Sequence, residues 1–131
     1  MKYWNDFEGS VFFNMVFSRL VEIDEVKLFS LSVDNNASVL TLAFNIKELP
    51  DRPPLKWKEF NSCRIGVSCS EVSDLSVKNI PTTSLLKVKI EPHGSRFRIS
   101  VGAADSIIEF TAAYLRLHDP SVYVALDDIE D

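Results

Sequence analysis

The sequence predicts a mainly β protein, either an antiparallel β-sandwich or a strongly bent sheet of about 7–8 strands, with one short N-terminal helix. Two observations lead to this fold class. From about residue 25 to residue 124, hydrophobic residues alternate with polar ones in short runs, which is the pattern of strands with one buried face. Residues that favour turns separate these runs at regular intervals, as they do in sandwiches.

One segment near the N-terminus has the period of a helix. Ser10 has a side chain suited to the N-cap position, and the residues after it place apolar side chains on one helical face. The members of this face are Phe12, Phe13, Val16, Phe17 and Leu20. We therefore expect one amphipathic helix between Ser10 and Leu20, whose aromatic face packs on a sheet.

The clearest strand signal is a hairpin in the first half of the chain. Phe29, Leu31 and Val33 alternate with serines, and a second alternating run covers residues 40–46. The residue types at positions 34–36, one Asp and two Asn, tolerate turn conformations. Further alternating runs cover residues 63–69, 75–77, 86–90, 97–101, 108–112, 115–117 and 122–124, with turns expected at 73–74, 92–94 and 102–105.

Residues 48–60 break the alternating pattern. Pro50, Pro53 and Pro54 have no amide proton and cannot serve in a central strand. We interpret the segment as a fixed excursion between strands rather than a linker between domains. The apolar residues expected to anchor it to the core are Leu49, Leu55, Trp57 and Phe60.

Length and composition indicate a single globular domain. The chain has 131 residues, of which 46% are hydrophobic and 25% charged. We assign the domain to residues 1–126 and expect the acidic tail at 127–131 to be disordered. The sequence has no run of about 18 apolar residues and no features of a secretion signal, so we expect no membrane segment and a cytoplasmic location.

The two cysteines fit a reducing compartment. Cys63 and Cys69 lie in one predicted strand, where six residues separate their α-carbons by roughly 20 Å. A disulfide needs α-carbons less than about 7 Å apart, so these residues cannot pair with each other. We expect two buried thiols that pack as small hydrophobic groups.

The sequence contains no motif of catalysis or of cofactor binding. Its four glycines form no phosphate-binding loop, and there is no Gly-x-Ser-x-Gly elbow for a serine nucleophile. His93 and His118 lack neighbours at ligand spacing, so no metal site is predicted. The carboxylates that follow one another closely are expected at the solvated rim. We therefore predict a protein that is not an enzyme and uses no cofactor.

Charge restricts the partner. The net charge is −5 at pH 7 and the pI is about 5.0, whereas a nucleic-acid binder needs a basic surface. No nucleic-acid partner is expected, but a basic protein partner is permitted. Four basic residues alternate with core positions and form either one basic strip or only the outward face of two paired strands; they are Lys87, Lys89, Arg96 and Arg98.

The segment Leu49-Pro50-Asp51-Arg52-Pro53-Pro54-Leu55-Lys56-Trp57 resembles the F/L-P-D-x-P-P-x-K-W signature of the immunity protein 50 family of bacterial polymorphic toxin systems. The helix with Phe12-Phe13 and the later strands are also similar to that family, so that the resemblance covers residues 3–124. The proline–tryptophan element is its specific part, because many β domains share alternating strands.

This resemblance implies an immunity protein that binds a cognate toxin domain in a fixed stoichiometry and blocks its active site or substrate groove. The family supplies no catalytic residues and no established contact positions. From the sequence itself we choose acidic residues that lie close together, which suit a basic toxin, and Trp57, which is either a contact hot spot or a plug of the core. The candidate partner-binding residues are Glu22, Asp24, Glu25, Trp57, Glu71 and Asp74.

Two other functions stay open at the level of sequence. A β-sandwich that binds a carbohydrate or another small molecule would need Trp57, Tyr114 and Tyr123 to line one cleft. A hydrolase would need two carboxylates facing each other in a cleft, with perturbed pKa values. No residue pattern indicates the oligomeric state or the identity of the toxin.

Overall fold

One strand, β1 (Glu25–Asp34), joins two layers of antiparallel strands in the computed structural model, which describes residues 1–80 and 84–126. The first layer contains β2 (Val39–Ile46), β3 (Ser62–Ser70), β8 (Tyr114–Leu117) and β9 (Ser121–Tyr123). The second contains β5 (Leu86–His93), β6 (Arg96–Gly102), β7 (Ile107–Ala112) and β4 (Ser73–Lys78). Two short helices precede β1, namely a 3-10 turn, η1 (Trp4–Asp6), and α1 (Val11–Val16).

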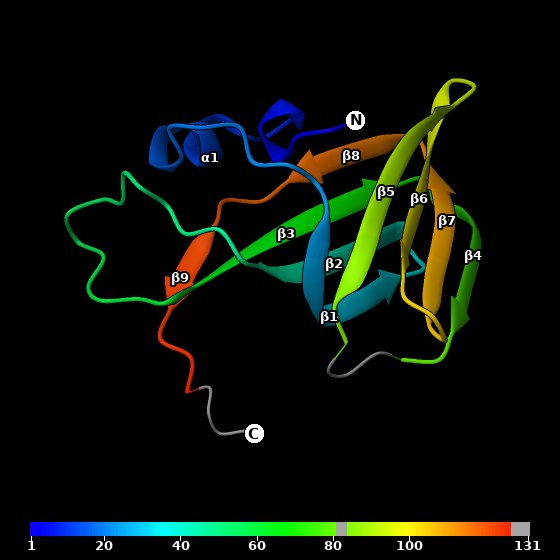
Figure 1. The fold of residues 1–131 in the computed structure, drawn as a ribbon. Coiled ribbons are helices and arrows are strands. Elements are labelled where there is room, and N and C mark those ends of the chain that lie inside the picture. Colours follow the sequence, from blue (N-terminus) through cyan, green and yellow to red (C-terminus); the bar gives the residue numbers. More distant parts are fainter. Residues whose placement is uncertain (81–83, 127–131) are drawn as a thin grey trace.

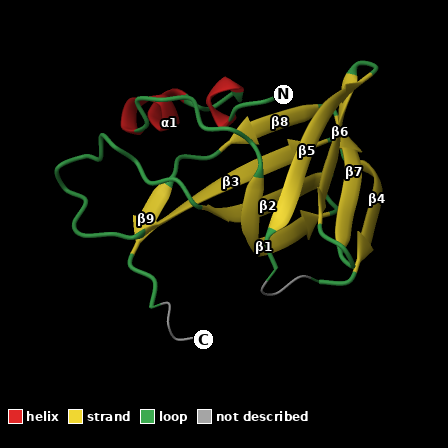
Figure 2. Ribbon diagram, viewed as in Figure 1, coloured by secondary structure: helices red, strands yellow, loops and turns green. Residues whose placement is uncertain are grey.

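The strands follow the order β4-β7-β6-β5-β1-β2-β3-β8, with β9 paired to β3 (Figures 1 and 2). All of these pairs are antiparallel. The predicted strongly bent antiparallel sheet is therefore confirmed, with nine strands in the part of the chain that the structure describes.

The bend of the sheet lies in β1. This strand pairs with β5 through Glu25 and Val26 and with β2 along nearly all of its remainder. Its register to β2 shifts between Leu28 and Ser30, which is the signature of a bulge that accommodates one extra residue. Because a bulge increases the local twist, the two ends of β1 can belong to different layers.

The bulge makes the expected alternation wrong at one position. Leu31 and Val33 share the core face, since they pair with buried residues of β2. Phe29 does not: its side chain is 56% exposed and lies against Arg64, on the outer side of the sheet. A bulged residue turns to the opposite face because it breaks the two-residue period of the strand.

Two chain segments cross between the layers at one corner. β3 leads into β4 through Glu71, which has a left-handed backbone (φ 54°), and β7 leads into β8 through Ala113. The Ala113 N–H donates a hydrogen bond of 3.0 Å to the Ser70 carbonyl, so the two crossings support each other. Asp74 is also left-handed (φ 57°), and β4 consequently leaves the line of β3 and pairs with β7.

The hydrophobic core lies between the two layers. Every second residue of β2 and β3 is buried, and β5 supplies the opposite wall with the same alternation over most of its length. The N-terminal segment covers the first layer, with α1 at the end that lies away from β5, β6 and β7 (Figure 1), while the amino group of Met1 donates a hydrogen bond of 3.1 Å to the Ile90 carbonyl of β5. There Trp4 packs on Phe44 with 5.9 Å between ring centroids, and Phe13 stacks on Phe17.

The N-terminal helix is shorter than predicted and ends at Val16. The chain after it contacts the 48–60 segment instead of continuing the helix. The Arg52 N–H donates to the Val16 carbonyl at 2.9 Å, and the Ser18 N–H donates to the Asp51 carboxylate at 2.9 Å. Leu20 is therefore 61% exposed rather than part of a buried helical face.

The turns follow their residue types, with one shift. Asp34 accepts a hydrogen bond of 3.1 Å from the Asn36 N–H, which closes the predicted β1–β2 hairpin. The turn expected at 92–94 lies later, because β5 continues to His93 and the chain reverses at Gly94 (φ 64°). Pro92 is tolerated within β5 because, among the described residues, no strand pairs with that part of its second edge.

Two further expectations concern the acidic tail and membrane-spanning helices. The acidic tail predicted at 127–131 lies outside the described residues. Within residues 1–80 and 84–126, no helix has the length and apolar character needed to cross a membrane, and α1 has only six residues.

Two phenylalanines of the β1–β2 hairpin test the assignment of faces. Phe44→Ala should lower the free energy of unfolding by about 3–5 kcal/mol, since its ring is 1% exposed and its loss leaves a cavity. Phe29→Ala should lower it by less than about 1 kcal/mol, because the exposed ring loses mainly one cation–π contact. Urea denaturation of both variants measures the difference, and equal losses would contradict the assigned faces.

Candidate interaction surface

The outer face of the first layer presents small side chains at its centre. Positions that alternate with the buried residues of β1, β2 and β3 point away from the core, and each is at least partly exposed. They are Ser30, Ser32, Thr41, Ala43, Gly66 and Ser68. The His118 side chain covers the β3 part of this face, since it lies 3.4 Å from the position that a Cβ at Gly66 would take and contacts the Ser68 hydroxyl. Over β1 and β2 the face stays low, so the larger side chains at its border determine what that part can contact.

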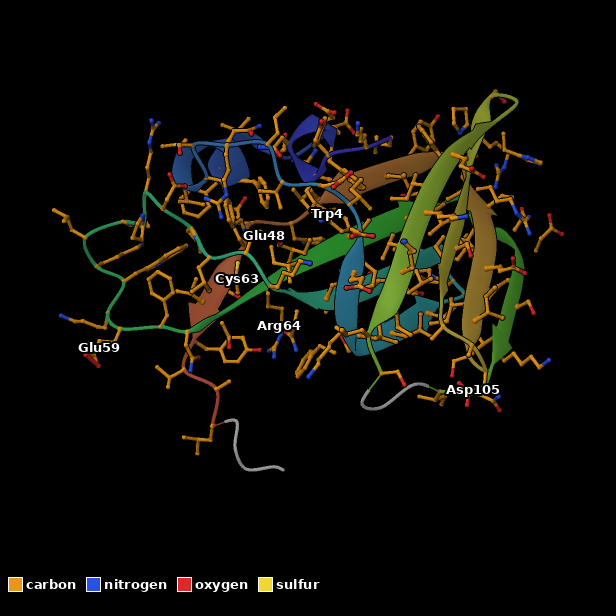
Figure 3. The ribbon with its side chains drawn as sticks, in the orientation of Figure 1. Trp4, Glu48, Glu59, Cys63, Arg64 and Asp105 are labelled. Carbon is orange, nitrogen blue, oxygen red and sulfur yellow. The ribbon has the colours of Figure 1, made fainter. Side chains whose placement is uncertain are left out.

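At one border of this face, Arg64 is held between two aromatic rings. Its guanidinium carbon lies 3.4 Å from the centroid of the Phe29 ring and 4.5 Å from that of Tyr123. Its Nε donates a hydrogen bond of 2.8 Å to Asn45 Oδ1. Arg64 extends to the side of the sheet opposite Trp4, which packs in the core (Figure 3). We call Phe29, Asn45, Arg64 and Tyr123 the Arg64 cluster.

The Arg64 cluster holds a guanidinium in place while using only a small part of its N–H donors. Each cation–π contact at an exposed site contributes about 0.5–1 kcal/mol. Arginine has five N–H donors, and within the described residues one of those of Arg64 forms a hydrogen bond. Arginine and aromatic residues dominate the binding energy of protein interfaces, and a side chain fixed in advance loses less conformational entropy on binding.

The predicted acidic contact residues form two groups, Glu22/Asp24/Glu25 and Glu71/Asp74. The first group lies at the start of β1, where Asp24 is 3.7 Å from Lys87. The second lies at the β3–β4 corner, where the Val72 N–H donates to the Ser38 carbonyl just beyond the end of β1. The length of β1, roughly 30 Å, separates the groups, so the structure does not gather them into one patch.

Trp57 is half-buried and packs at the margin of the core. Its ring forms edge-to-face contacts with Phe12 and Phe60, at centroid distances of 5.8 and 6.3 Å. Pro50 of the same segment is buried, and Leu49 and Trp57 pack against the core, which supports the interpretation of a fixed excursion. Leu55 is fully exposed and does not anchor it, contrary to expectation. These contacts are those of a plug of the core, while a partner contact of Trp57 stays a prediction.

The three rings that a carbohydrate site would need do not meet. Tyr123 pairs with Ser62 and Tyr114 with Ser70, at opposite ends of β3. Eight residues of strand place these two positions roughly 27 Å apart, and Trp57 lies in the separate 48–60 segment. The structure therefore gives the carbohydrate alternative no common cleft.

Chemically reactive groups are sparse in the described part of the chain. No cluster of three or more His, Cys, Asp or Glu side chains there has an arrangement that could hold a metal ion. Cys63 and Cys69 are free and buried, as predicted. Burial raises the pKa of each thiol to about 12, with a smaller contribution from Glu48 at Cys63. Such thiols are protonated at neutral pH and poor nucleophiles.

The basic residues of the β5–β6 hairpin form the outward face of two paired strands: Lys87, Lys89, Arg96 and Arg98. Carboxylates interrupt them. Glu91 pairs across the hairpin with Arg98, whose guanidinium lies 3.3 Å from the carboxylate of Glu109. Of the two expectations for these residues, the uninterrupted basic strip is not formed.

Sequence reasoning did not identify the Arg64 cluster. The alternation in β3 indicates that Arg64 points outward, but its neighbours come from β1, β2 and β9. Phe29 reaches it only because of the bulge, which no local residue pattern announces. The available signal was a lone arginine among small residues of a strand.

Comparison with known proteins gives one match. A family model described as Immunity protein 50 matches residues 9–123 of the 131-residue chain. No match was found among curated proteins or among solved structures.

The contacts of Asp51 predict a pH effect. Hydrogen bonds from the Ser18 hydroxyl and N–H, supplemented by the nearby Arg19, hold the pKa of Asp51 below its usual value of 3.8. A lowered pKa stabilises the fold above the unfolded-state value, and this stabilisation disappears as pH falls through the folded-state value. Asp51→Asn should therefore be less stable than the natural chain at neutral pH, and the difference should shrink below pH 3.8.

Urea denaturation at neutral pH and at about pH 3 measures this difference. Glu59→Gln, which removes an exposed carboxylate from the same segment, is the control. A stability difference between Asp51→Asn and the natural chain that is the same at both pH values would refute the assigned role of the Asp51 charge.

Proposed function

Because the chain belongs to the immunity protein 50 family, we propose that it binds one cognate toxin domain in the bacterial cytoplasm and blocks it by contact alone, without catalysis. The observation that carries the proposal is the match to residues 9–123, which includes nearly every element of the sheet. We further propose that residues 1–126 act as a single domain in this role.

We assign the toxin contact to the Arg64 cluster and the small-residue face beside it. Two features support this assignment. The cluster offers an exposed aromatic ring and an arginine fixed in advance, which are typical of residues that carry interface energy. The neighbouring small side chains of β1 and β2 allow a convex partner to approach that part of the sheet closely. A stable interface would bury about 1,600 Å² in total, which requires the face as well as the cluster.

The distribution of charge along the chain indicates which residues would attract a basic toxin. All 14 Lys and Arg residues lie within residues 1–126, together with 15 of the 19 Asp and Glu residues, so this part has a net charge of −1. The remaining four carboxylates lie in residues 127–131. In our proposal, the long-range attraction of a basic toxin depends mainly on residues 127–131. Within residues 1–126, Glu71 and Asp74 are the acidic group that contributes to it.

The proposed contact predicts a binding defect for one arginine. Arg64→Ala should weaken binding to the cognate toxin domain by about tenfold or more, because a pre-positioned interface arginine is lost. Arg98→Ala removes an arginine from the outer face of the other layer and serves as the matched control. Calorimetric titration measures both affinities, and an unchanged affinity of Arg64→Ala would remove the cluster from the interface.

The function itself is tested by co-expression of the chain with that toxin domain. Survival of the cells and co-purification in a fixed stoichiometry are the expected results. A toxin that keeps its activity in the presence of excess chain would contradict the proposal.

The uneven charge predicts a kinetic effect. A chain shortened to residues 1–126 should associate with a basic toxin domain about tenfold more slowly at low salt, while its dissociation rate changes little. The salt dependence of association should become weaker as well. Stopped-flow measurements at several salt concentrations test this, and an unchanged association rate would place the attraction in residues 1–126.

A further inference from the structure

Two strand edges face each other across an open seam. Beyond Val26, the edge of β1 that faces away from β2 has no strand partner among the described residues, and the same holds for the edge of β4 that faces away from β7. Residues 28–31 line one hollow of this seam together with Val77, Asn79 and Ile80, and Val33 and residues 72–75 line the next. β1 and β4 thus run in opposite directions along the two sides of one groove.

Along the groove, apolar side chains at the edge of the hydrophobic core stay exposed. Val77 shares a face with the buried Ile108, and Val33 shares one with the buried Leu40, yet Val77 is 42% and Val33 55% exposed. Ile80 is exposed at the same margin. The two hollows have volumes of about 410 and 250 Å³. Apolar side chains that converge on open space from two strands mark a surface suited to a further apolar segment.

In the described residues, the edges of β1 and β4 both present backbone groups without a strand partner along the seam. An edge strand presents N–H and C=O groups that pair readily with another extended chain. A segment laid in the seam would find such groups on both sides, while its alternate side chains would enter the groove. Residues 28–33 span roughly 20 Å, so the seam accepts a strand of about six residues.

The charged residues of the seam favour one orientation of a bound strand. Asp74 lines the end formed by β4 and the β1–β2 hairpin, and Glu71 lies at the same corner, where the Arg96 guanidinium donates to the Glu71 carbonyl and to Ser73 Oγ rather than to either carboxylate. Neither forms a salt bridge with any described residue. The opposite end of β4 carries Lys78. A strand with a basic residue beside Asp74 would therefore complement the seam, whereas the reverse placement would set like charges together.

We propose that this seam receives an extended strand of the toxin partner, about six residues long, with alternating apolar side chains and a Lys or Arg beside Asp74. The inference rests on the proposed function and specifies how the partner is held. It is continuous with the proposed contact face, since Phe29 belongs both to the Arg64 cluster and to the lining of the seam. The added strand would join β1 to β4 across the seam.

Two substitutions probe the seam without disturbing the core. Leu75→Lys introduces charge at a partly exposed seam position, and Leu20→Lys, at an exposed position after α1, is its matched control. Asp74→Asn removes the charge but keeps a residue type that tolerates the left-handed backbone. With the cognate toxin domain, Leu75→Lys should raise Kd about tenfold or more and Asp74→Asn about threefold, while Leu20→Lys leaves it unchanged.

Hydrogen exchange reports the added strand directly. In the complex, amides of residues 29–34 and 73–78 should exchange more slowly than in the free chain. If the complex forms but these amides and the Leu75→Lys affinity are unchanged, the seam proposal is wrong while the proposed function stands. If the natural chain is a dimer that Leu75→Lys converts to a monomer, the occupant is a second copy and the proposal is also wrong.

A separate probe keeps the two proposals distinguishable. If the toxin domain does not bind, the proposed function fails, and the synthetic peptide Lys-Val-Thr-Val-Thr-Val then tests the seam alone. Shifts of the β1 and β4 amide resonances with added peptide would support a strand site. An absence of shifts at millimolar peptide would overturn it.

Discussion

Strand β1 pairs with two different neighbours, and this double pairing shapes the whole sheet. Its first residues pair with β5 and the remainder with β2, so one strand must belong to both layers. The bulge between Leu28 and Ser30 supplies the twist that this requires. The same bulge turns Phe29 outward to Arg64 and leaves the second edge of β1 without a strand partner in the described residues. The arrangements of the core, the contact face and the seam therefore all follow from the bulge in β1.

The segment that carries the family resemblance acts mainly in the architecture. Asp51 binds Ser18 and lies 3.2 Å from Arg19, so it fixes the chain just after α1. Trp57 packs between Phe12 and Phe60 at the margin of the core. A signature of this kind identifies the fold but says little about where the partner is held. The surfaces with free arginine donors, aromatic rings and unpaired strand edges lie on other elements.

The distribution of charge separates attraction from contact. The acidic residues chosen from the sequence are divided between the two ends of β1, and residues 1–126 have almost as many basic as acidic side chains. The proposed contact face includes an arginine rather than a carboxylate. Net charge acts over distances near the Debye length, whereas interface energy comes from groups that lose their water. An acidic chain can therefore bind through a face that is not acidic.

The fold class, the hairpins and the burial of both cysteines could be predicted from the order of residues, because each follows from a two-residue period or from the chemistry of a turn. Residues 49–57 also indicated the family whose model matches residues 9–123. The end of α1, the direction of Phe29 and the strand edges that lack a partner among the described residues became known from the folded chain. Those features depend on hydrogen bonds and pairings between residues far apart in the chain, such as Arg52 with Val16, and a local pattern contains no information about them.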